Sequence, residues 1–230
     1  MKILCAIPFF NEKKNLKNLI RDLEKNKMNL NEYFDFIFID DGSDDGSVKI
    51  VSNYDYIVNK KNLGYGSTIK IAISYGIKKN YSHISVMPGD YQRNFEDLLK
   101  LREELLQNKD CDLINGSKLH LKEIPFWNKA TNIFFSFYVR LLNMSKNNTD
   151  VLSGFRIYNV NSLGNFFSIL PNDYAFDSCF FLNMLKSKKK IRNVNVFANY
   201  KNQTTKMRFK AIVFFKIFIK LTIFNFKTIL

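Results

Sequence analysis

Two adjacent carboxylates, Asp40 and Asp41, directly follow an apolar segment at residues 36–39. The order Phe-Ile-Phe-Ile in that segment is typical of a buried strand. Turn-forming glycine, serine and aspartate residues come next. Neighbouring carboxylates at a strand end repel each other unless positive groups or hydrogen-bond donors lie nearby. We therefore interpret Asp40 and Asp41 as ligand-binding residues, and the later aspartates of the turn as capping residues of the next helix.

Strand-like and helix-like segments alternate over the first half of the chain. Five short apolar segments predict strands, at residues 3–9, 36–39, 56–58, 84–87 and 112–115. Between these segments, apolar residues recur at helical spacing. In the second half we expect helices at residues 127–142 and 176–185 and strands at residues 154–158 and 194–197. This alternation predicts an α/β fold with a mostly parallel sheet and helices on both faces, and ligands bind such sheets beyond the carboxyl ends of the strands.

The composition is that of a globular protein with a large excess of positive charge. The chain has 230 residues, 46% of them hydrophobic, and a formal net charge of +14. That charge favours an anionic partner, which can be nucleic acid, a phosphorylated substrate or an acidic membrane surface. We disfavour nucleic acid, because no nucleic-acid-binding motif is recognisable and no basic helical stripe occurs outside the last segment.

The cysteines and the apolar stretches indicate a reduced protein without a membrane-spanning helix. Cys5, Cys111 and Cys179 have neither zinc-site spacing nor the pattern of a disulfide framework. We expect them to be reduced core residues of a cytosolic protein. The first ten residues lack the pattern of a signal peptide, and no uninterrupted apolar stretch reaches the roughly 18 residues that a spanning helix needs.

The C-terminal segment combines phenylalanine, isoleucine and leucine with regularly placed lysines. Lys216, Lys220 and Lys227 have spacings of four and seven, which put them on one helical face. A core helix is one interpretation. We favour an interfacial helix lying in a membrane surface, because one domain's core would struggle to cover so much apolar side chain. We thus predict a domain at residues 1–205 and a basic amphipathic membrane-interfacial segment at 206–230.

Four more motifs join Asp40 and Asp41 in a fixed order. They are Ile7-Pro8-Phe9-Phe10-Asn11-Glu12, Asn62-Leu63-Gly64-Tyr65-Gly66, Pro88-Gly89-Asp90-Tyr91-Gln92 and Ser153-Gly154-Phe155-Arg156. With these motifs the chain resembles family 2 glycosyltransferases of the GT-A fold. It is most similar to the branch of dolichyl-phosphate mannose synthase and its polyprenyl-phosphate relatives. The resemblance covers about residues 3–206.

The resemblance implies a nucleotide-diphosphate sugar, GDP- or UDP-linked, as the donor. In the family, the nucleoside pocket is lined at the positions of Pro8, Phe10, Glu12, Asp40 and Asp41. Carboxylates accept hydrogen bonds from a base or ribose, and Phe10 offers a face for stacking. Glu12 fits equally well as a first-turn helix residue, and Phe10 as a core residue. Gly64 lets the backbone turn tightly and approach the ligand.

The family's Asp-x-Asp metal motif is incomplete in this chain. Pro88 stands where the first aspartate would be, Asp90 matches the second, and Gln92 matches a glutamine near the metal. The family motif binds Mg²⁺ or Mn²⁺, which stabilises the departing diphosphate. Mg²⁺ can be bound by one or two carboxylates with phosphates and water, so Asp90 and Gln92 are the predicted metal ligands. A metal-independent or weakened enzyme is the alternative.

Three basic residues are the candidates for binding phosphates. Lys118 matches a family arginine, and Arg156 matches an arginine near the acceptor phosphate. Lys206 resembles the end of a late family motif. Phosphate acceptors and diphosphate leaving groups need such cations. With Asp90, the resemblance therefore assigns catalytic roles to Lys118 and Arg156 and a binding role to Lys206, although exposed lysines can also be simple surface charges.

The implied reaction is inverting transfer of a sugar to a polyprenyl phosphate on the cytoplasmic face of a membrane. Because this acceptor is already an anion, no strong general base is needed. The absence of a catalytic histidine agrees with this, since His83 begins a predicted strand and His120 lies in a predicted loop. A glycan hydroxyl is the alternative acceptor, with Asp150 or Asp177 as its base. A degenerate, non-catalytic membrane-associated relative is a third interpretation, and a membrane subunit is a further candidate partner.

Overall fold

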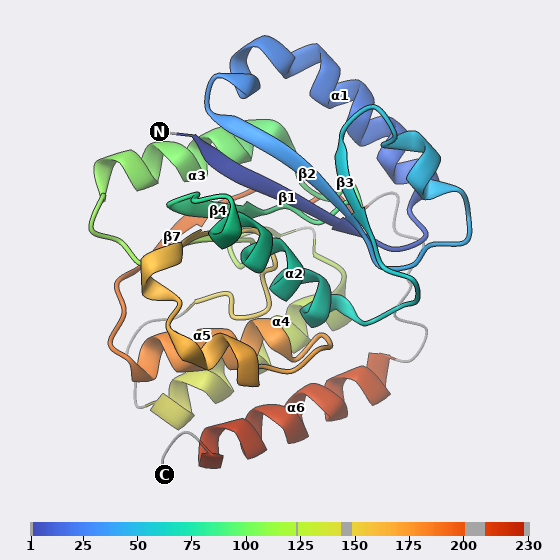
Figure 1. The fold of residues 1–230 in the computed structure, drawn as a ribbon. Coiled ribbons are helices and arrows are strands. Elements are labelled where there is room, and N and C mark those ends of the chain that lie inside the picture. Colours follow the sequence, from blue (N-terminus) through green and yellow to red (C-terminus); the bar gives the residue numbers. More distant parts are fainter. Residues whose placement is uncertain (1, 123, 144–148, 201–209, 228–230) are drawn as a thin grey trace.

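The apolar segments assemble into one seven-stranded sheet, in the order β3-β2-β1-β4-β6-β5-β7 (Figure 1). The computed structural model describes residues 2–122, 124–143, 149–200 and 210–227. The strands are β1 (Ile3–Phe9), β2 (Phe34–Asp40), β3 (Asp55–Val58), β4 (His83–Val86), β5 (Leu113–Ser117), β6 (Arg156–Asn159) and β7 (Ile191–Asn195). β6 runs antiparallel to both β4 and β5, whereas the other pairs are parallel. The predicted mostly parallel α/β sheet is confirmed.

Helices cover both faces of the sheet (Figure 1). They are α1 (Lys13–Asn31), α2 (Tyr65–Lys78), α3 (Phe95–Gln107), α4 (Phe126–Asn143), α5 (Phe176–Lys186) and α6 (Lys210–Lys227). β1 is buried along its whole length, as expected for a strand with helices on both sides. Ile3, Cys5 and Ile7 share a core with α1 and α3, while Leu4 and Ala6 share the other core with α2 and α5. Alternate side chains of one strand thus anchor both helical layers.

The sequence pattern was least reliable for short and edge elements. The predicted helix near residue 50 is a 3₁₀-helix at Ser47–Ile50, and two further 3₁₀-helices lie at Val160–Ser162 and Asn165–Ile169. The last strand occupies Ile191–Asn195 instead of 194–197. β7 pairs with β5 alone and has exposed side chains, so it lacks the apolar run that marks a central strand.

α6 packs against the domain with one face and exposes the other. Ile217, Leu221 and Phe224 are buried, and the rings of Phe214 and Phe134 lie 4.9 Å apart. The exposed face carries large apolar side chains, namely Ile212, Phe215, Ile219, Ile223 and Phe226. The helix therefore has the packed face of a core helix and the apolar outer face expected of an interfacial one.

The proposed boundary between residues 205 and 206 lies outside the described residues. The interfacial position of α6 rests on its exposed apolar face. Within the described ranges, no helix is both long and apolar enough to cross a membrane.

The turn after β2 depends on a glycine that another residue cannot replace. Gly42 and Gly46 both have positive φ, +80° and +82°, a region that other residues adopt with strain. A Cβ atom on Gly42 would stand 2.6 Å from the backbone carbon of Lys61. A Cβ atom on Gly46 would meet only the end of the Lys13 side chain, at 3.6 Å. The two glycines thus share the φ requirement and differ in the space around them.

Replacing these glycines by alanine separates the two effects. We expect Gly46→Ala to lower the free energy of unfolding by about 1–2 kcal/mol, because it adds only the cost of positive φ. Gly42→Ala should lower it by a further ~1–3 kcal/mol, because the Lys61 backbone must also move. Urea unfolding of both variants and the wild type measures the difference. Equal losses would show that the close approach at Gly42 has no energetic effect.

Candidate active site

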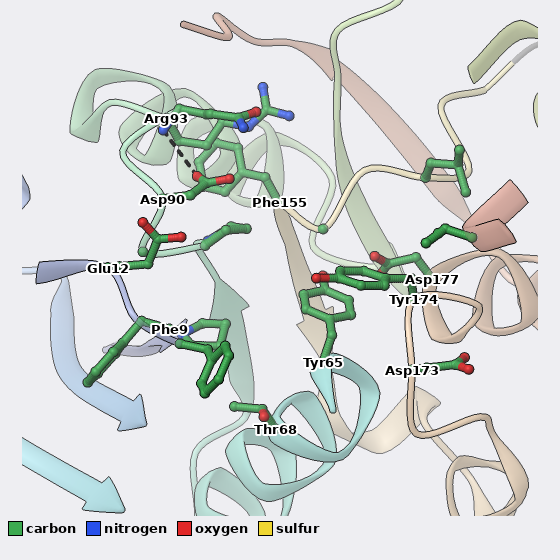
Figure 2. Close-up of a pocket in the computed structure, with 18 of the residues that line it drawn as sticks. Phe9, Glu12, Tyr65, Thr68, Asp90, Arg93, Phe155, Asp173, Tyr174 and Asp177 are labelled. Carbon is green, nitrogen blue, oxygen red and sulfur yellow. Dashed lines mark hydrogen bonds between the residues drawn. The ribbon is translucent and has the colours of Figure 1, made fainter. Parts of the chain in front are cut away.

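A cavity of about 640 Å³ lies at the carboxyl ends of the central strands (Figure 2). Such a volume suits a small-molecule ligand. Its walls come from the segments after β1, β2, β4 and β5, and from α4, α5 and α6. It therefore occupies the place where α/β sheets bind ligands.

The segment after β1 forms one wall. Pro8 lies near the end of β1, and Phe10 and Glu12, which follow the strand, are half-buried; all three line the cavity. The Glu12 carboxylate accepts a hydrogen bond of 2.6 Å from the Asn15 amide. The backbone N–H of Glu12 donates to the Ser47 hydroxyl at 2.9 Å, which fixes the start of α1. The structure thus brings the three predicted residues together at the cavity.

Asp40 and Asp41 have different roles in the structure. Asp41 lines the cavity and accepts hydrogen bonds from Leu63 N–H at 2.9 Å, Gly64 N–H at 3.0 Å and the Asn59 amide at 3.1 Å. Asp40 is fully buried and does not line the cavity. Its carboxylate accepts from the backbone N–H and the hydroxyl of Ser43. Separate sets of donors therefore stabilise the two neighbouring carboxylates.

Gly64 lies in the cavity wall directly before α2. Its φ of +95° and the nearby Asn172 carbonyl oxygen, 2.6 Å from where a Cβ would stand, leave no room for a side chain. Its N–H is already used by Asp41. Gly64 therefore shapes the cavity wall through its backbone conformation, while that N–H points to Asp41.

Asp90 and Gln92 line the cavity beside Glu12, and Figure 2 shows the carboxylates of Glu12 and Asp90 on the same side. The backbone N–H of Gln92 donates to Asp90 at 3.1 Å. Burial raises the pKa of Asp90 to about 6, a rise that the Gln92 N–H and Arg93 oppose and Glu12 adds to. A single carboxylate is therefore kept in a poorly solvated position, where a cation would stabilise its charged form.

These donors fit a divalent cation that takes most of its ligands from elsewhere. Among the described residues, no group of three or more histidine, cysteine, aspartate or glutamate side chains could hold a metal ion. Asp90 and Gln92 nonetheless offer two oxygen donors on one cavity wall. Mg²⁺ is commonly bound by one or two carboxylates together with substrate phosphates and water. The arrangement suits that mode and not an all-protein metal cage.

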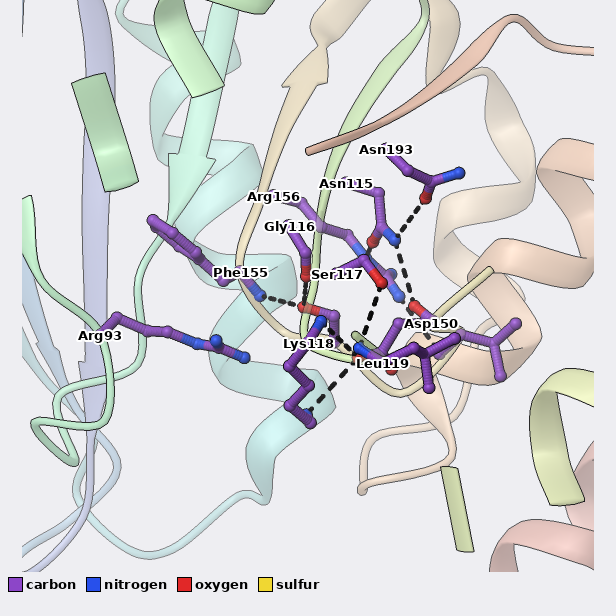
Figure 3. A network of polar contacts seen from close by, with 12 residues as sticks. Arg93, Asn115, Gly116, Ser117, Lys118, Leu119, Asp150, Phe155, Arg156 and Asn193 are labelled. Carbon is purple, nitrogen blue, oxygen red and sulfur yellow. Dashed lines mark hydrogen bonds and ion pairs between the residues drawn. The ribbon is translucent and has the colours of Figure 1, made fainter. Parts of the chain in front are cut away.

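Lys118 and Arg93, which follow β5 and β4, supply positive charge to the cavity. The Lys118 ammonium lies 3.8 Å from Asp150, whose carboxylate also accepts from the Lys118 N–H at 3.3 Å (Figure 3). Burial lowers the pKa of Lys118, Asp150 raises it, and Arg93 lowers it further. The sequence motifs did not indicate Arg93, which directly follows Gln92 but lies outside the matched segment.

Arg156 lies beneath the cavity and does not line it. Its side chain is fully buried, pairs with Asp177 at 3.3 Å and donates to the Val151 carbonyl at 3.0 Å. It also donates to the Asn115 side-chain oxygen at 2.9 Å (Figure 3). This placement differs from the predicted contact with an acceptor phosphate. Phe155, directly before β6, lines the cavity, whereas the Arg156 guanidinium at the start of β6 pairs with Asp177 of α5.

Asp177 is the titratable group of α5 that faces the cavity (Figure 2). Burial raises its pKa to about 6, against the opposing effects of Arg156 and a hydrogen bond from Tyr65. Tyr65 stacks on Tyr174 with ring centres 5.6 Å apart, and both line the cavity. Of the two bases predicted for a hydroxyl acceptor, Asp177 lines the cavity, and Asp150 is buried behind Lys118.

The helices α4 and α6 complete the cavity wall. α4 contributes the polar side chains of Asn128, Thr131 and Asn132, and α6 contributes Lys216 among apolar residues. Lys220, on the same helix face in the sequence pattern, instead pairs with Asp173 at 2.5 Å. The lysine spacing alone did not indicate that α6 reaches the cavity. Lys206 lies outside the described residues, so its predicted role is not tested.

Known proteins resemble the chain in sequence. The sequence model of the family described as Glycosyl transferase family 2 matches residues 5–167. An uncharacterized protein of Methanocaldococcus jannaschii is 28% identical over 215 residues, which are 87% of this chain and 90% of the relative. The UDP-N-acetylglucosamine–dolichyl-phosphate N-acetylglucosaminyltransferase of Methanococcus voltae is 27% identical over 188 residues, 70% of each chain.

A solved structure resembles the chain in fold. It is glucosyl-3-phosphoglycerate synthase of Mycobacterium tuberculosis, in complex with Mn²⁺, UDP-glucose and phosphoglyceric acid. The TM-score is 0.72 at 14% identity, and the match covers 97% of this chain and 79% of the other. At this identity the likeness concerns the fold, which is the GT-A fold of glycosyltransferases.

Because the pKa of Asp90 is raised, we predict that removing its carboxylate stabilises the fold in a pH-dependent way. The folded protein binds more protons than the unfolded chain between about pH 4 and pH 6, so this carboxylate destabilises the fold progressively as the pH rises through that range. Asp90→Asn should therefore raise the free energy of unfolding by about 1–3 kcal/mol at pH 7.5 and hardly at all at pH 4. Urea unfolding at both pH values measures the gain.

Asp44→Asn is the matched control, because Asp44 is exposed in the turn after β2. We expect it to leave stability within about 0.5 kcal/mol at either pH. A gain for Asp90→Asn that is the same at pH 4 and pH 7.5 would contradict the burial of its charge.

Proposed function

The chain belongs to glycosyl transferase family 2, and we propose that it transfers a sugar from a nucleotide-diphosphate sugar to a dolichyl-type polyprenyl phosphate at a membrane surface. One observation carries this proposal. The cavity joins an acidic wall at the strand ends to basic side chains, and α6 connects it to an exposed apolar surface. The dolichyl-phosphate acceptor in the name of the M. voltae relative supports the same acceptor class.

The acidic wall is the proposed nucleoside site. The carboxylates of Glu12 and Asp41 are hydrogen-bond acceptors for base N–H and ribose hydroxyl groups, and Phe10 beside them offers a stacking face. Asp41 also holds the loop before α2 through its contacts with Leu63 and Gly64. Nucleotide binding and the shape of this loop are therefore coupled. The proposed donor sugar is linked to GDP or UDP, and the UDP-linked sugar in the name of the M. voltae relative supports UDP.

The basic side chains are the proposed phosphate sites. Lys118, directly after β5, and Lys216 of α6 both line the cavity. We assign Lys216 to the acceptor phosphate because it comes from the helix that carries the exposed apolar face. A phosphate held there would have its polyprenyl chain leading out along that helix.

An exposed apolar surface covers α4 and α6, and we call it the α4–α6 surface. It comprises Phe126, Trp127, Ile133, Phe134, Phe137, Leu141, Ile212, Phe215, Ile219, Ile223 and Phe226. The two helices meet through Phe134 and Phe214 and through Tyr138 and Phe218, each pair 4.9 Å between ring centres. Large contiguous apolar surfaces of this kind mark binding sites for membranes or proteins. We place this surface in the lipid headgroup region on the cytoplasmic face, and a membrane subunit is the other candidate to cover it.

The transfer itself needs no proton acceptor when the nucleophile is a phosphate. An oxygen of the acceptor phosphate attacks the anomeric carbon from the side opposite the leaving group. The bond from that carbon to the diphosphate oxygen breaks, and its electron pair leaves with the nucleoside diphosphate. The donor sugar's configuration is thereby inverted, and the protein's contribution is orientation and cationic stabilisation of the diphosphate.

Asp90 and Gln92 would hold a divalent cation at the diphosphate. Such a cation, when bound, supplies charge stabilisation for the departing diphosphate. Asp90 would present its ionised carboxylate from the wall beside Glu12, and the Gln92 side chain would add a neutral oxygen. The incomplete motif at Pro88 leaves the remaining ligands to phosphates and water.

Asp177 supports a second candidate function, which is transfer to a glycan hydroxyl. This carboxylate lines the cavity and has a pKa of about 6, so it is mostly ionised at neutral pH and can accept a proton. Its pairing with Arg156 and Tyr65 also fits a purely structural role. The two functions therefore give opposite expectations for Asp177: a phosphate acceptor does not need its carboxylate as a base, and a hydroxyl acceptor does.

We expect label from a nucleotide sugar to enter organic-extractable lipid when polyprenyl phosphate is supplied in detergent, and not when polyprenol is supplied. Asp177→Asn should retain transfer to within about tenfold, whereas loss of a true general base costs roughly 10²–10⁴-fold. Thermal unfolding of the variant controls for the buried charge left on Arg156. Transfer to polyprenol, abolished in Asp177→Asn, would favour the hydroxyl acceptor. Donor binding without transfer to any acceptor would leave a non-catalytic relative.

The membrane assignment predicts binding to anionic vesicles through the α4–α6 surface. The double variant Phe137→Ser, Phe215→Ser should weaken binding to phosphatidylcholine–phosphatidylglycerol vesicles at least about tenfold, because two exposed rings leave the interface. Met28→Ser is the matched control, since Met28 on α1 is 93% exposed and lies outside this surface. Co-sedimentation measures binding. An equal effect of both variants, or of neither, would contradict docking through α4 and α6.

A further inference from the structure

Arg93 is a buried cation at the cavity that makes no salt bridge in the described part of the chain. It is 6% exposed and lines the cavity. One of its N–H groups donates to the Phe197 carbonyl at 2.7 Å, and its guanidinium lies 5.7 Å from the centre of the Phe155 ring. No salt bridge among the described residues includes Arg93. Buried charges are usually paired, so this guanidinium is arranged for an anion from outside the chain.

Arg156 shows what a structural arginine looks like in the same protein. Its side chain is fully buried, pairs with Asp177 at 3.3 Å and donates to Asn115 and Val151. It does not line the cavity. Arg156 is thus stabilised by a carboxylate and amide oxygens of the chain itself, whereas Arg93 has no comparable set of partners among the described residues.

Lys118 brings a second cation to the same part of the cavity. It follows β5, whereas Arg93 follows β4, and Figure 3 shows both side chains extending into the same region. Arg93 disfavours the charged form of Lys118, whose pKa it lowers. Two like charges brought together at a cavity are stabilised when an anion binds between them.

The position of Arg93 relative to Asp90 identifies which anion fits. Arg93 follows Asp90 by three residues, and the two side chains interact electrostatically in the cavity. Glu12 and Asp41 lie on the acidic wall at the ends of β1 and β2, and Arg93 and Lys118 lie beyond Asp90 at β4 and β5. A nucleotide with its nucleoside on the acidic wall would therefore extend its phosphates past Asp90 toward Arg93.

We propose that Arg93, together with Lys118, binds the diphosphate of the donor nucleotide and stabilises the negative charge that it gains as the sugar leaves. The planar guanidinium can donate to two phosphate oxygens at once. It thereby supplies positive charge beside a motif in which Pro88 has replaced a carboxylate. This inference rests on the proposed function and adds a residue that the sequence motifs did not indicate.

The test is calorimetric titration with UDP, UMP, uridine, GDP and GMP in EDTA, so that the protein's own groups hold the phosphates. Arg93→Gln should weaken UDP or GDP binding about tenfold to hundredfold, because a charge-assisted hydrogen bond is lost, and weaken the monophosphate by less than about threefold. Arg93→Lys should be intermediate, since it retains charge without the fork. Arg192→Gln, on exposed β7, is the matched control and should bind as the wild type does.

Further measurements keep the result interpretable if Arg93→Gln folds poorly. Lys118→Gln should reduce diphosphate selectivity in the same direction, and inorganic pyrophosphate should compete with UDP or GDP on the wild type. Equal weakening of diphosphate and monophosphate by Arg93→Gln, or no weakening, would overturn the inference and leave the proposed function standing. Failure of the wild type to bind any of these nucleotides, both in EDTA and with Mg²⁺ added, would overturn the proposed function and this inference with it.

Discussion

The parallel pairing of β1 with β2 on one side and β4 on the other is the constraint on which the cavity depends. Phe9 pairs with Asp40, and Ala6 pairs with Val86, so the three strands end at the same edge. Glu12, Asp41 and Asp90 follow those ends in the chain and reach one cavity for that reason. A slip of one residue in either pairing would turn alternate side chains to the opposite face and separate them. The two cores on either side of β1 fix this register.

Charge at this edge is stabilised by two different means. Asp40 and Asp41 are each satisfied by backbone or side-chain donors within the chain, and Arg156 is satisfied by Asp177. Asp90 has one backbone donor and a raised pKa, and Arg93 has a carbonyl and a ring as its partners. The first group shapes the cavity without a ligand. The second would be stabilised further by an ionic ligand, which is a common property of functional sites.

The sequence predicted elements better than it predicted side-chain direction. The apolar runs of β1 and β2 identified the central strands, because residues buried on both faces leave no polar interruption. The motif at Ser153 to Arg156 was recognised, but which of its side chains faces the cavity depends on how the chain enters β6, which pairs antiparallel with two strands distant in sequence. Motif spacing contains no information on that register. Arg93 was missed because it lies outside the matched motif, although its neighbour Gln92 was recognised.

The C-terminal helix α6 shows the same difference between a predicted element and the direction of its side chains. Its lysine spacing suggested a basic stripe facing headgroups, yet Lys220 is held by Asp173 and Lys216 lines the cavity. The same helix buries Ile217 and Leu221 against the domain and exposes Phe215 and its neighbours. A helix with these three faces cannot be an independent anchor, because moving it would also open the cavity. In the proposed function, contact of its outer face with lipid would hold the cavity wall in place and bring the phosphate acceptor near, and so would couple membrane binding to substrate binding through one rigid element.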